Sequence, residues 1–477
     1  MMGDGITFLL HSTLWLVLLI TVSDGSHFRG GFVSCGPADP KTRGGFDSRG
    51  NVKLRCDYRV AWRRTYNDDT KCDEVKRNTG VVLAGAGDLS CRTGCSGLFG
   101  RLTIACTEFS IREDWSQGGG FFIYTFTGSP SRFRASLEDC CWIGTLARYS
   151  DSDFVMAISM DLSRRSDTGA INHSPTSNQP AIRRLQYGCA QNLSLLVEDL
   201  DGDTVRCRWG QTSNIHGEDE CGGICPPLHD ARLTANPCRL WVPPTLEEGK
   251  LHAVSIVFED FPKNIPNGAP MSQVSFQFLL DVQSSTQACS SRPVLVEPSP
   301  QDKICIPISP NTEYRVTLKA RQTISSNMIS SFSITQPVGM QRSSISSTNQ
   351  NGVYYGEVAL NWRPRVEQYG PHVFCFLATD NTGQTSEQRC ITLMAGASSP
   401  LIVRGTMQPS TATSATVSHY YESFSVDFNQ QVFKSNNQAK IHISEVNGSR
   451  TTRVLSLVAS TSKSVLVEQH PTHDSHY

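Results

Sequence analysis

The stretch Val274-Ser-Phe-Gln-Phe-Leu-Leu-Asp-Val282 alternates apolar and polar side chains, with Leu279 as the one exception. Successive residues of a β-strand point to opposite faces, so this period of two predicts a strand with one face toward a core. The same alternation recurs over residues 314–318 and 424–428, and helical periodicity is nearly absent. Turn residues separate these runs at short spacing. The sequence therefore predicts an all-β fold of tandem antiparallel Ig-like β-sandwiches with a Cys-rich β module at the N-terminus.

Length and composition limit the class of protein. A chain of 477 residues predicts three or four domains. Its 43 basic and 44 acidic residues give a net charge of −1, which supplies no attraction to nucleic acid, so we expect no nucleic-acid partner. Its 17 cysteines indicate an oxidising, extracellular compartment.

Residues 1–25 have the pattern of a signal peptide. An apolar run over 6–22 is followed by the small residues Ser23, Gly25 and Ser26. The usual positive charge before the run is absent, so an uncleaved anchor is the alternative. No later stretch reaches the roughly 18 apolar residues that span a bilayer. We expect a secreted protein, or a membrane-anchored one if the chain is a C-terminally truncated fragment.

Three connectors divide the rest of the chain. Residues 172–180 are rich in Asn, Ser, Thr and Pro, residues 284–300 are rich in Ser and Pro, and residues 395–400 form a small-residue hinge. The predicted modules are a Cys-rich β module and three sandwiches, which span 26–171, 172–284, 285–396 and 397–477. The last has about 80 residues, whereas a sandwich takes about 100. It is therefore expected to be incomplete, or to borrow an edge strand from elsewhere.

Three segments resemble extracellular modules. The stretch from Val373 to Leu393, with Cys375, Asp380, Gly383 and Cys390, resembles the last hairpin of hyalin-repeat modules. The acidic run from 195 to 207 is similar to the hairpins of cadherin-like domains, and 423–443 resembles a bacterial-type Ig-like module. These resemblances imply adhesion or matrix modules, which share no catalytic residues. The module 26–171 resembles no family that we can name.

The cysteines cannot all pair within their modules. Eight fall in 26–171, five in 172–284 and four in 285–396. The odd cysteine of the second module is free, is matched across a boundary, or joins another chain in a disulfide-linked oligomer. Cys375 and Cys390 lie symmetrically about the turn at Thr382–Gly383, which predicts a disulfide between facing strands, with pairing between sheets as the alternative. The adjacent Cys140 and Cys141 are expected to bond to two different partners.

Asp199, Asp201 and Asp203 are candidate calcium ligands. Ca²⁺ prefers several carboxylate oxygens, and alternate acidic residues converge at a turn. The spacing is not that of an EF-hand, since Gly202 is the fourth position rather than the sixth. The alternative is a plain hairpin turn in which Asp201-Gly202 supplies the positive φ. No other cofactor is indicated.

The remaining motifs favour binding over catalysis. Asn172, Asn192 and Asn447 each begin a glycosylation motif. The motifs His-Glu-x-x-His and Gly-x-Ser-x-Gly and a phosphate-binding loop are absent. We therefore expect a secreted binding, adhesion or matrix protein without enzymatic activity, whose partner is an extracellular protein or glycan. The alternatives are a secreted enzyme with its site in the N-terminal module, and a fragment of a cell-surface receptor ectodomain.

Overall fold

The computed structural model describes residues 27–397, except 39–44, 67, 69, 129–130, 151, 227, 263–264 and 266, together with five strands between 408 and 468. The described chain is built from β-strands with one short α-helix, α1 (Glu74–Thr79), and a 3-10 turn at Val366–Gln368. The prediction of an all-β fold is therefore confirmed. Within this part of the chain, no helix has the length and apolar character needed to cross a membrane. The expected signal peptide lies outside the described residues.

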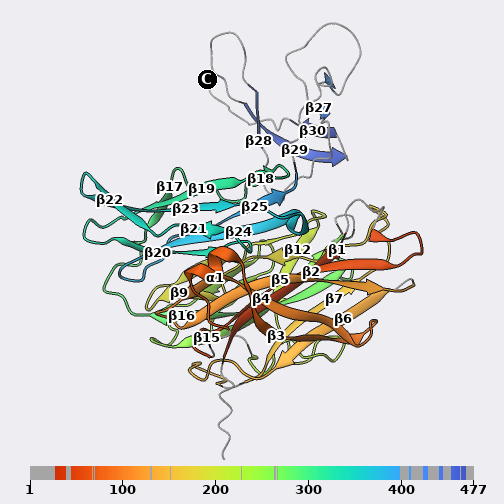
Figure 1. The fold of residues 1–477 in the computed structure, drawn as a ribbon, viewed down its shortest axis with the longest axis horizontal. Helices are drawn as coiled ribbons and strands as arrows, with labels where there is room; N and C mark the ends of the chain where they lie inside the picture. The colour runs from red at the N-terminus through yellow and green to blue at the C-terminus, as the bar shows by residue number, and fades with distance from the viewer. Residues whose placement is uncertain are drawn as a thin grey trace, which may run out of the picture.

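The first body is organised by an eleven-stranded sheet (Figure 1). Its main path runs through β1 (Phe28–Pro37), β2 (Val52–Arg63), β5 (Trp115–Phe126), β4 (Leu98–Ser110), β3 (Val82–Thr93), β6 (Arg132–Asp139), β7 (Phe154–Asp161), β16 (Ser272–Gln283), β15 (Leu251–Phe261) and β12 (Thr204–Trp209). The eleventh strand, β9 (Ile182–Gln186), lies parallel to β16. Strand β1 also pairs with β16, through Gly31–Gln277 and Phe32–Phe276, so the path from β1 to β16 closes into a ring.

Strand β16 contains the stretch 274–282 and is buried on both faces. One edge pairs with β15, and β7, β1 and β9 share the other along its length. The polar side chains that alternation would place toward solvent are instead hydrogen-bonded inside the body. Ser275 Oγ accepts from the Ala157 N–H at 2.6 Å, and Gln277 Nε2 donates to the Cys221 carbonyl at 3.0 Å. The period of two predicts the strand correctly, while the polar face is satisfied by neighbouring segments rather than by water.

The sheet is continuous across the expected boundary at 171/172. Strands from 26–171 and from 172–284 pair with each other, and one hydrophobic cluster extends from Phe28 to Val282. Two small sheets complete this body. They consist of β10 (Gln191–Ser194), β14 (Arg239–Val242) and β13 (Arg232–Thr234), and of β8 (Thr176–Ser177) with β11 (Val197–Glu198). Because β11 pairs with β8 and β12 pairs with β15, the acidic segment 199–203 does not close the hairpin expected there.

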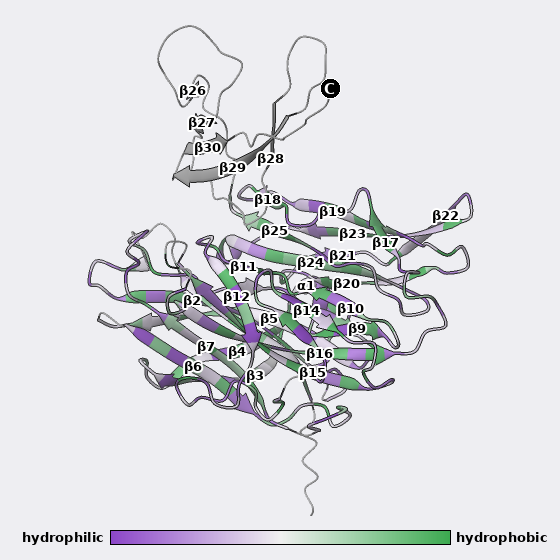
Figure 2. Cartoon of the chain, turned by 180° about the vertical axis from the view of Figure 1, so that it is seen from behind, coloured by the Kyte–Doolittle hydropathy of each residue, from purple (hydrophilic) through white to green (hydrophobic). Residues whose placement is uncertain are grey.

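The second body is a sandwich of two sheets around its own core. Leu318, Trp362, Phe374 and Phe376 fill the space between the sheets. Figure 2 shows apolar and polar bands alternating along the strands. One sheet contains β17 (Val294–Val296), β19 (Tyr314–Arg321), β23 (Val353–Trp362), β21 (Gln341–Arg342) and β22 (Ser346–Gln350); the other contains β18 (Cys305–Ile308), β25 (Arg389–Ala395), β24 (Gly370–Asp380) and β20 (Ile329–Thr335).

A five-stranded sheet follows near the C-terminus (Figure 1). Its order is β26 (Gln408–Pro409), β27 (Ser423–Asp427), β30 (Ser464–Glu468), β29 (Arg453–Thr461) and β28 (Lys440–Ile443). Strand β27 falls on the alternating run at 424–428.

Seven disulfides link the described cysteines. They are Cys35–Cys56, Cys72–Cys106, Cys91–Cys95, Cys140–Cys141, Cys189–Cys289, Cys221–Cys225 and Cys375–Cys390. Cys375 faces Cys390 across β24 and β25 with a Cα separation of 4.0 Å. The expectation of separate partners for Cys140 and Cys141 is wrong, because the structure bonds them to each other.

Three cysteines remain as thiols, and Cys189–Cys289 shows how the odd count arises. That bond crosses the expected boundary at 284/285, so the unmatched cysteine need not lie in the second module. Cys207 and Cys238 are buried together, and both sulfurs lie near the Ala235 carbonyl oxygen, at 3.6 and 3.2 Å. Cys305 is exposed. A disulfide-linked oligomer stays a prediction, and Cys305 is the cysteine through which it would form.

Candidate functional site

A groove of about 880 Å³ lies between the two bodies. Strands β1, β2 and β5 of the first body and the segments 336–341 and 361–373 of the second form its walls. Its charged and ring-bearing lining residues include Arg55, Asp57, Arg59, Phe121, His173, Arg363, Arg365, Glu367, Tyr369 and His372. The groove therefore presents polar and aromatic groups drawn from distant parts of the sequence.

The outer face of β2 supplies the charged wall. Leu54, Cys56 and Tyr58 point into the core, so alternation turns Arg55 and Arg59 outward. The Arg55 guanidinium has three partners. It forms an ion pair with Asp57 at 2.9 Å and lies 3.9 Å from the centre of the Phe121 ring. It also donates a hydrogen bond to the Glu367 carbonyl at 2.5 Å. The last contact joins the two bodies directly across the groove.

Arg59 has no comparable partner. Cross-strand neighbours are the usual partners of a strand side chain, and those of Arg59 are Phe32 on β1 and Gly119 on β5, neither of which carries an acceptor side chain. Within the described part of the chain, its guanidinium makes no hydrogen bond or ion pair. Burial lowers the pKa of Arg59 to about 9. A half-buried, uncompensated cation on a groove wall is a suitable partner for an anionic ligand group.

Gly119 keeps this wall free of side chains. A Cβ at this position would lie 2.5 Å from the Tyr58 carbonyl oxygen. Strand β5 therefore passes close against β2 with only hydrogen as a side chain opposite Arg59. The run Gly118-Gly119-Gly120 thus has a packing role in the sheet rather than that of a phosphate loop at a helix start.

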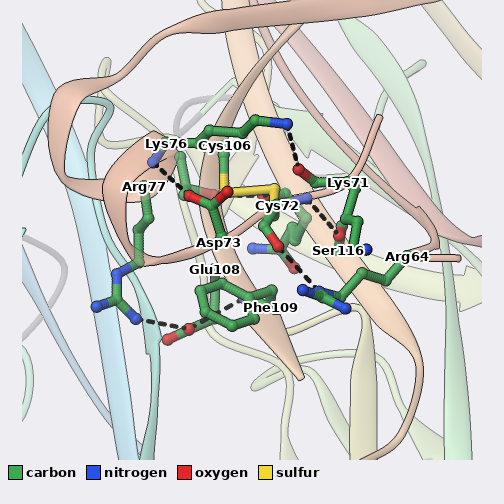
Figure 3. Close-up of a disulfide and its surroundings, with 12 residues drawn as sticks. Arg64, Lys71, Cys72, Asp73, Lys76, Arg77, Cys106, Glu108, Phe109 and Ser116 are labelled. Atoms are coloured by element: carbon green, nitrogen blue, oxygen red, sulfur yellow. Dashed lines mark hydrogen bonds and ion pairs between the residues drawn. A yellow bond between two sulfur atoms is a disulfide. The ribbon is translucent and has the colours of Figure 1, made fainter. Parts of the chain in front are cut away.

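A buried ion cluster holds the two bodies together beside the groove. Glu108 on β4 lies 3.7 Å from Arg77 of the first body and 2.7 Å from Arg342 of the second. Figure 3 shows Arg77 reaching Glu108 next to the Cys72–Cys106 disulfide. Because Glu108 contacts an arginine of each body, this cluster ties one wall of the groove to the other.

Helix α1 positions Arg77 for this contact. The Asp73 side chain caps the helix by accepting from the Lys76 N–H at 2.8 Å, as drawn in Figure 3. Gly80 ends it with φ of 65°, in the left-handed region. Residues 78–80 continue into the groove lining.

The candidate calcium ligands are only partly brought together. Asp199 and Asp203 meet Asp260 of β15, with one oxygen from each carboxylate within 4.8 Å of the others, and all three are buried. Asp201 turns away, accepting from His173 at 3.0 Å and from Arg165 at 3.0 Å. The three carboxylates that the fold brings together are therefore those of Asp199, Asp203 and Asp260, and not that of Asp201. The local sequence does not single out Asp260, because Glu259 stands directly before it in the same strand.

Arg165 provides the positive charge of this cluster. It pairs with both oxygens of Asp203, with Asp167 at 2.7 Å, and with Asn172 Oδ1 at 2.8 Å. Burial by itself would lower the pKa of Arg165, but the hydrogen bonds that it donates to Asp167 and Asp203 raise this pKa above its usual range. Nothing in the local sequence distinguishes Arg165 from its neighbour Arg164.

The carboxylates that Arg165 does not reach are hard to ionise. Burial, and then repulsion from Asp260, raise the pKa of Asp199 well above its usual value. Burial likewise raises the pKa of Asp260 to about 6, even though Ser272 and Asn172 donate hydrogen bonds to it. In the described part of the chain, the cluster therefore holds more carboxylates than the Arg165 guanidinium can balance.

The three glycosylation candidates have different surroundings. Asn192 is exposed on the edge strand β10 and remains a predicted acceptor. Asn172 is 1% exposed, and its Nδ2, the atom that would carry the sugar, donates to Asp260 Oδ2 at 2.6 Å. A glycan at Asn172 is incompatible with this fold, so that expectation is corrected. Asn447 lies outside the described residues.

Comparison with known proteins gives a match in the Cys-rich segment. The family model of the N-terminal domain of integrin beta-like proteins A–E matches residues 43–163. Integrin beta-like protein E of Dictyostelium discoideum is 19% identical over 325 residues, which cover 60% of this chain and 16% of that protein. The chain therefore spans about a sixth of the curated relative it matches. The matched segment carries Arg59 and Glu108.

Solved structures give only distant likenesses. The sialic acid binding region of a Streptococcus sanguinis adhesin is 11% identical, with a TM-score of 0.17, and the match covers 54% of this chain and 93% of that one. Titin Ig domains A164–A165 are 10% identical, with a TM-score of 0.16, and the match covers 46% of this chain and 96% of that one. Scores this low carry no argument about the site.

Proposed function

We propose that this chain is an extracellular adhesion protein that acts by binding and not by catalysis. The observation that carries the proposal is the match of residues 43–163 to the N-terminal domain of integrin beta-like proteins, supported by the longer, weaker similarity to one such protein. The seven disulfides are consistent with an oxidising compartment. We therefore propose that the protein acts outside the cell.

The groove between the bodies is the proposed ligand surface. Arg59 is half-buried and has no partner among the described residues, so it selects an acidic group, a carboxylate or a sulfate, on an extracellular glycan or protein. A guanidinium binds such groups through paired hydrogen bonds, and burial strengthens them. Phe121 and Tyr369 supply ring surface on the same lining. The wall geometry is fixed by the Glu108 cluster, so the groove is preformed.

The test is binding of the purified full chain to an array of sulfated, carboxylated and neutral glycans and acidic peptides. We expect retention of acidic probes and a loss of about tenfold or more for Arg59→Gln, since a hydrogen bond to a charged group contributes about 1.5–3 kcal/mol. Arg101→Gln is the matched control, because Arg101 is an exposed arginine on β4 that pairs with Asp88 at 3.0 Å. Equal binding by wild type and Arg59→Gln would remove the groove from the proposal. Absence of binding to every probe and to cell surfaces would remove the adhesive function.

A further inference from the structure

The cluster around Asp199 contains an oxygen that the protein leaves without a partner. Asp199 is 7% exposed, and its Oδ1 accepts from the backbone N–H groups of Asp201 and Asp203, both at 2.9 Å. Its Oδ2 is buried and makes no hydrogen bond in the described structure. Buried carboxylate oxygens are nearly always satisfied, so this one requires an explanation.

The neighbouring carboxylates are held in place by other donors. Asp260 accepts from the Ser272 N–H at 2.7 Å and from Asn172 at 2.6 Å, and Asp203 is gripped by Arg165. These three donors lie outside the segment 199–203, and they converge on carboxylates with negligible exposure. The arrangement orients the three carboxylates toward one another despite their repulsion.

The described residues do not balance the charge of the cluster. Arg165 is the guanidinium that contacts the acidic residues, and the carboxylates to which it donates are those of Asp167, Asp201 and Asp203. Asp199 and Asp260 have neutral donors instead. An unneutralised buried carboxylate is costly, so a further positive charge is expected where Asp199, Asp203 and Asp260 meet.

We propose that Asp199, Asp203 and Asp260 bind one calcium ion, with the free Oδ2 of Asp199 as a ligand. The donors are carboxylate oxygens, which suit a hard cation rather than zinc. Calcium accepts irregular coordination completed by water and carbonyl oxygens, whereas magnesium demands near-ideal octahedral geometry. The inference stands apart from the groove's ligand, because it rests on the cluster alone.

The ion would brace a segment that reaches the groove. Asp199 and Asp203 lie at the two ends of the segment 199–203, whose Leu200 lines the groove. Asp201 in the same segment holds His173, which is also a lining residue. Calcium would therefore order one end of the groove while remaining outside it.

The direct test is calorimetric titration of the full chain, stripped with chelator, with calcium. Extracellular modules bind calcium with Kd of about 0.1–1 mM, which sets the range to scan. We expect one ion per chain and a rise in the unfolding temperature as calcium is added. The wild-type titration needs no variant, so it decides the matter even if a substitution fails to fold.

Two variants locate the ion. Asp199→Asn removes the charge of the free oxygen but keeps Oδ1 as an acceptor, and should lower calcium affinity at least tenfold and abolish the thermal shift. Asp281→Asn is the control, since Asp281 is a buried aspartate at the opposite end of the β15–β16 ladder, where it accepts from Gln283. Its affinity should match wild type. Wild-type protein that binds no calcium would overturn the proposal, and an Asp199→Asn variant more stable than wild type at neutral pH would then show a proton in place of the ion. Equal loss in both variants would also overturn it.

Discussion

Arg59 and Arg165 belong to the same body but have opposite surroundings. Arg165 is enclosed by Asp167, Asp201 and Asp203, which raise its pKa, whereas burial without a counter-charge lowers the pKa of Arg59. One site has too much negative charge and the other has uncompensated positive charge. Both are electrostatically incomplete, which is typical of places that receive something from outside the chain.

Glu108 is a third case, because the fold supplies its counter-charges from both bodies. It lies between Arg77 and Arg342, is buried, and has no access to a ligand. Its role is to join the bodies. Structural charge clusters therefore have their counter-charges within the fold, whereas the proposed binding sites have a charged group that no described residue pairs.

The largest expected effect comes from removing the cation of the acidic cluster. Arg165→Met leaves Asp167, Asp201 and Asp203 without their shared counter-charge. It should cost about 5 kcal/mol of unfolding free energy, near the upper end for a broken buried pair. Chemical denaturation in chelator measures it. Arg164→Met is the control, because Arg164 is exposed and lies over Phe46, and it should cost little. Similar losses in the two variants would contradict the contrast between the arginines.

Removing the carboxylate of the Glu108 cluster should have the next largest effect. Glu108→Gln leaves Arg77 and Arg342 buried without a carboxylate and should lower the unfolding free energy by about 3 kcal/mol. Glu138→Gln, at a half-exposed pair with Arg92, should change it by less than about 1 kcal/mol. The same denaturation series compares them. A loss at Glu138 as large as that at Glu108 would mean that burial does not set the energetics here.

What the sequence predicts well is local. The alternation at 274–282 predicts a strand, and counting outward from Thr382–Gly383 places Cys375 opposite Cys390, because both depend only on strand periodicity and one turn. The partners of a strand do not follow from its own pattern. Strand β16 contacts β1, β7, β9 and β15, and no local signal reveals that Ser275 and Gln277 bond to other segments.

The candidate sites show the same limit. Asp199 and Asp203 were found because they are close in sequence, but Asp260 joins them only through the pairing of β12 with β15, in which Val205 faces Asp260. Arg59 is of interest because the described structure gives its guanidinium no acceptor. Whether an acceptor is present depends on all the side chains that the fold places around it. The lack of an acceptor among the described residues was visible only once Phe32 and Gly119 lay beside Arg59.

A pH effect on stability is expected at His372 in the groove. Burial lowers the pKa of His372, which lines the groove and contacts the Gln368 carbonyl at 2.6 Å. The folded state therefore favours the neutral ring. Its contribution to stability is present above the unfolded value of about 6.5 and is lost as the pH falls toward the lower folded value.

Denaturation midpoints of wild type and His372→Gln between pH 7.5 and about 5 test this. The variant should lack part of the stability loss seen in wild type on acidification. His216→Gln, at an exposed histidine, should follow wild type. If His372→Gln and wild type lose stability in parallel, the neutral ring at this position is not what the fold requires.

The smallest change in stability is expected at Arg59, and it is the sharpest test of the comparison. Arg59→Met removes a half-buried charge that the fold does not pair, so the unfolding free energy should stay unchanged or rise by up to about 1 kcal/mol. Acidic-probe binding should fall in the same variant. A residue whose removal stabilises the protein while abolishing binding is retained for the ligand, not for the fold. A loss of more than about 1 kcal/mol would instead give Arg59 the structural role of Arg165 and Arg77, and the groove would lose its distinguishing feature.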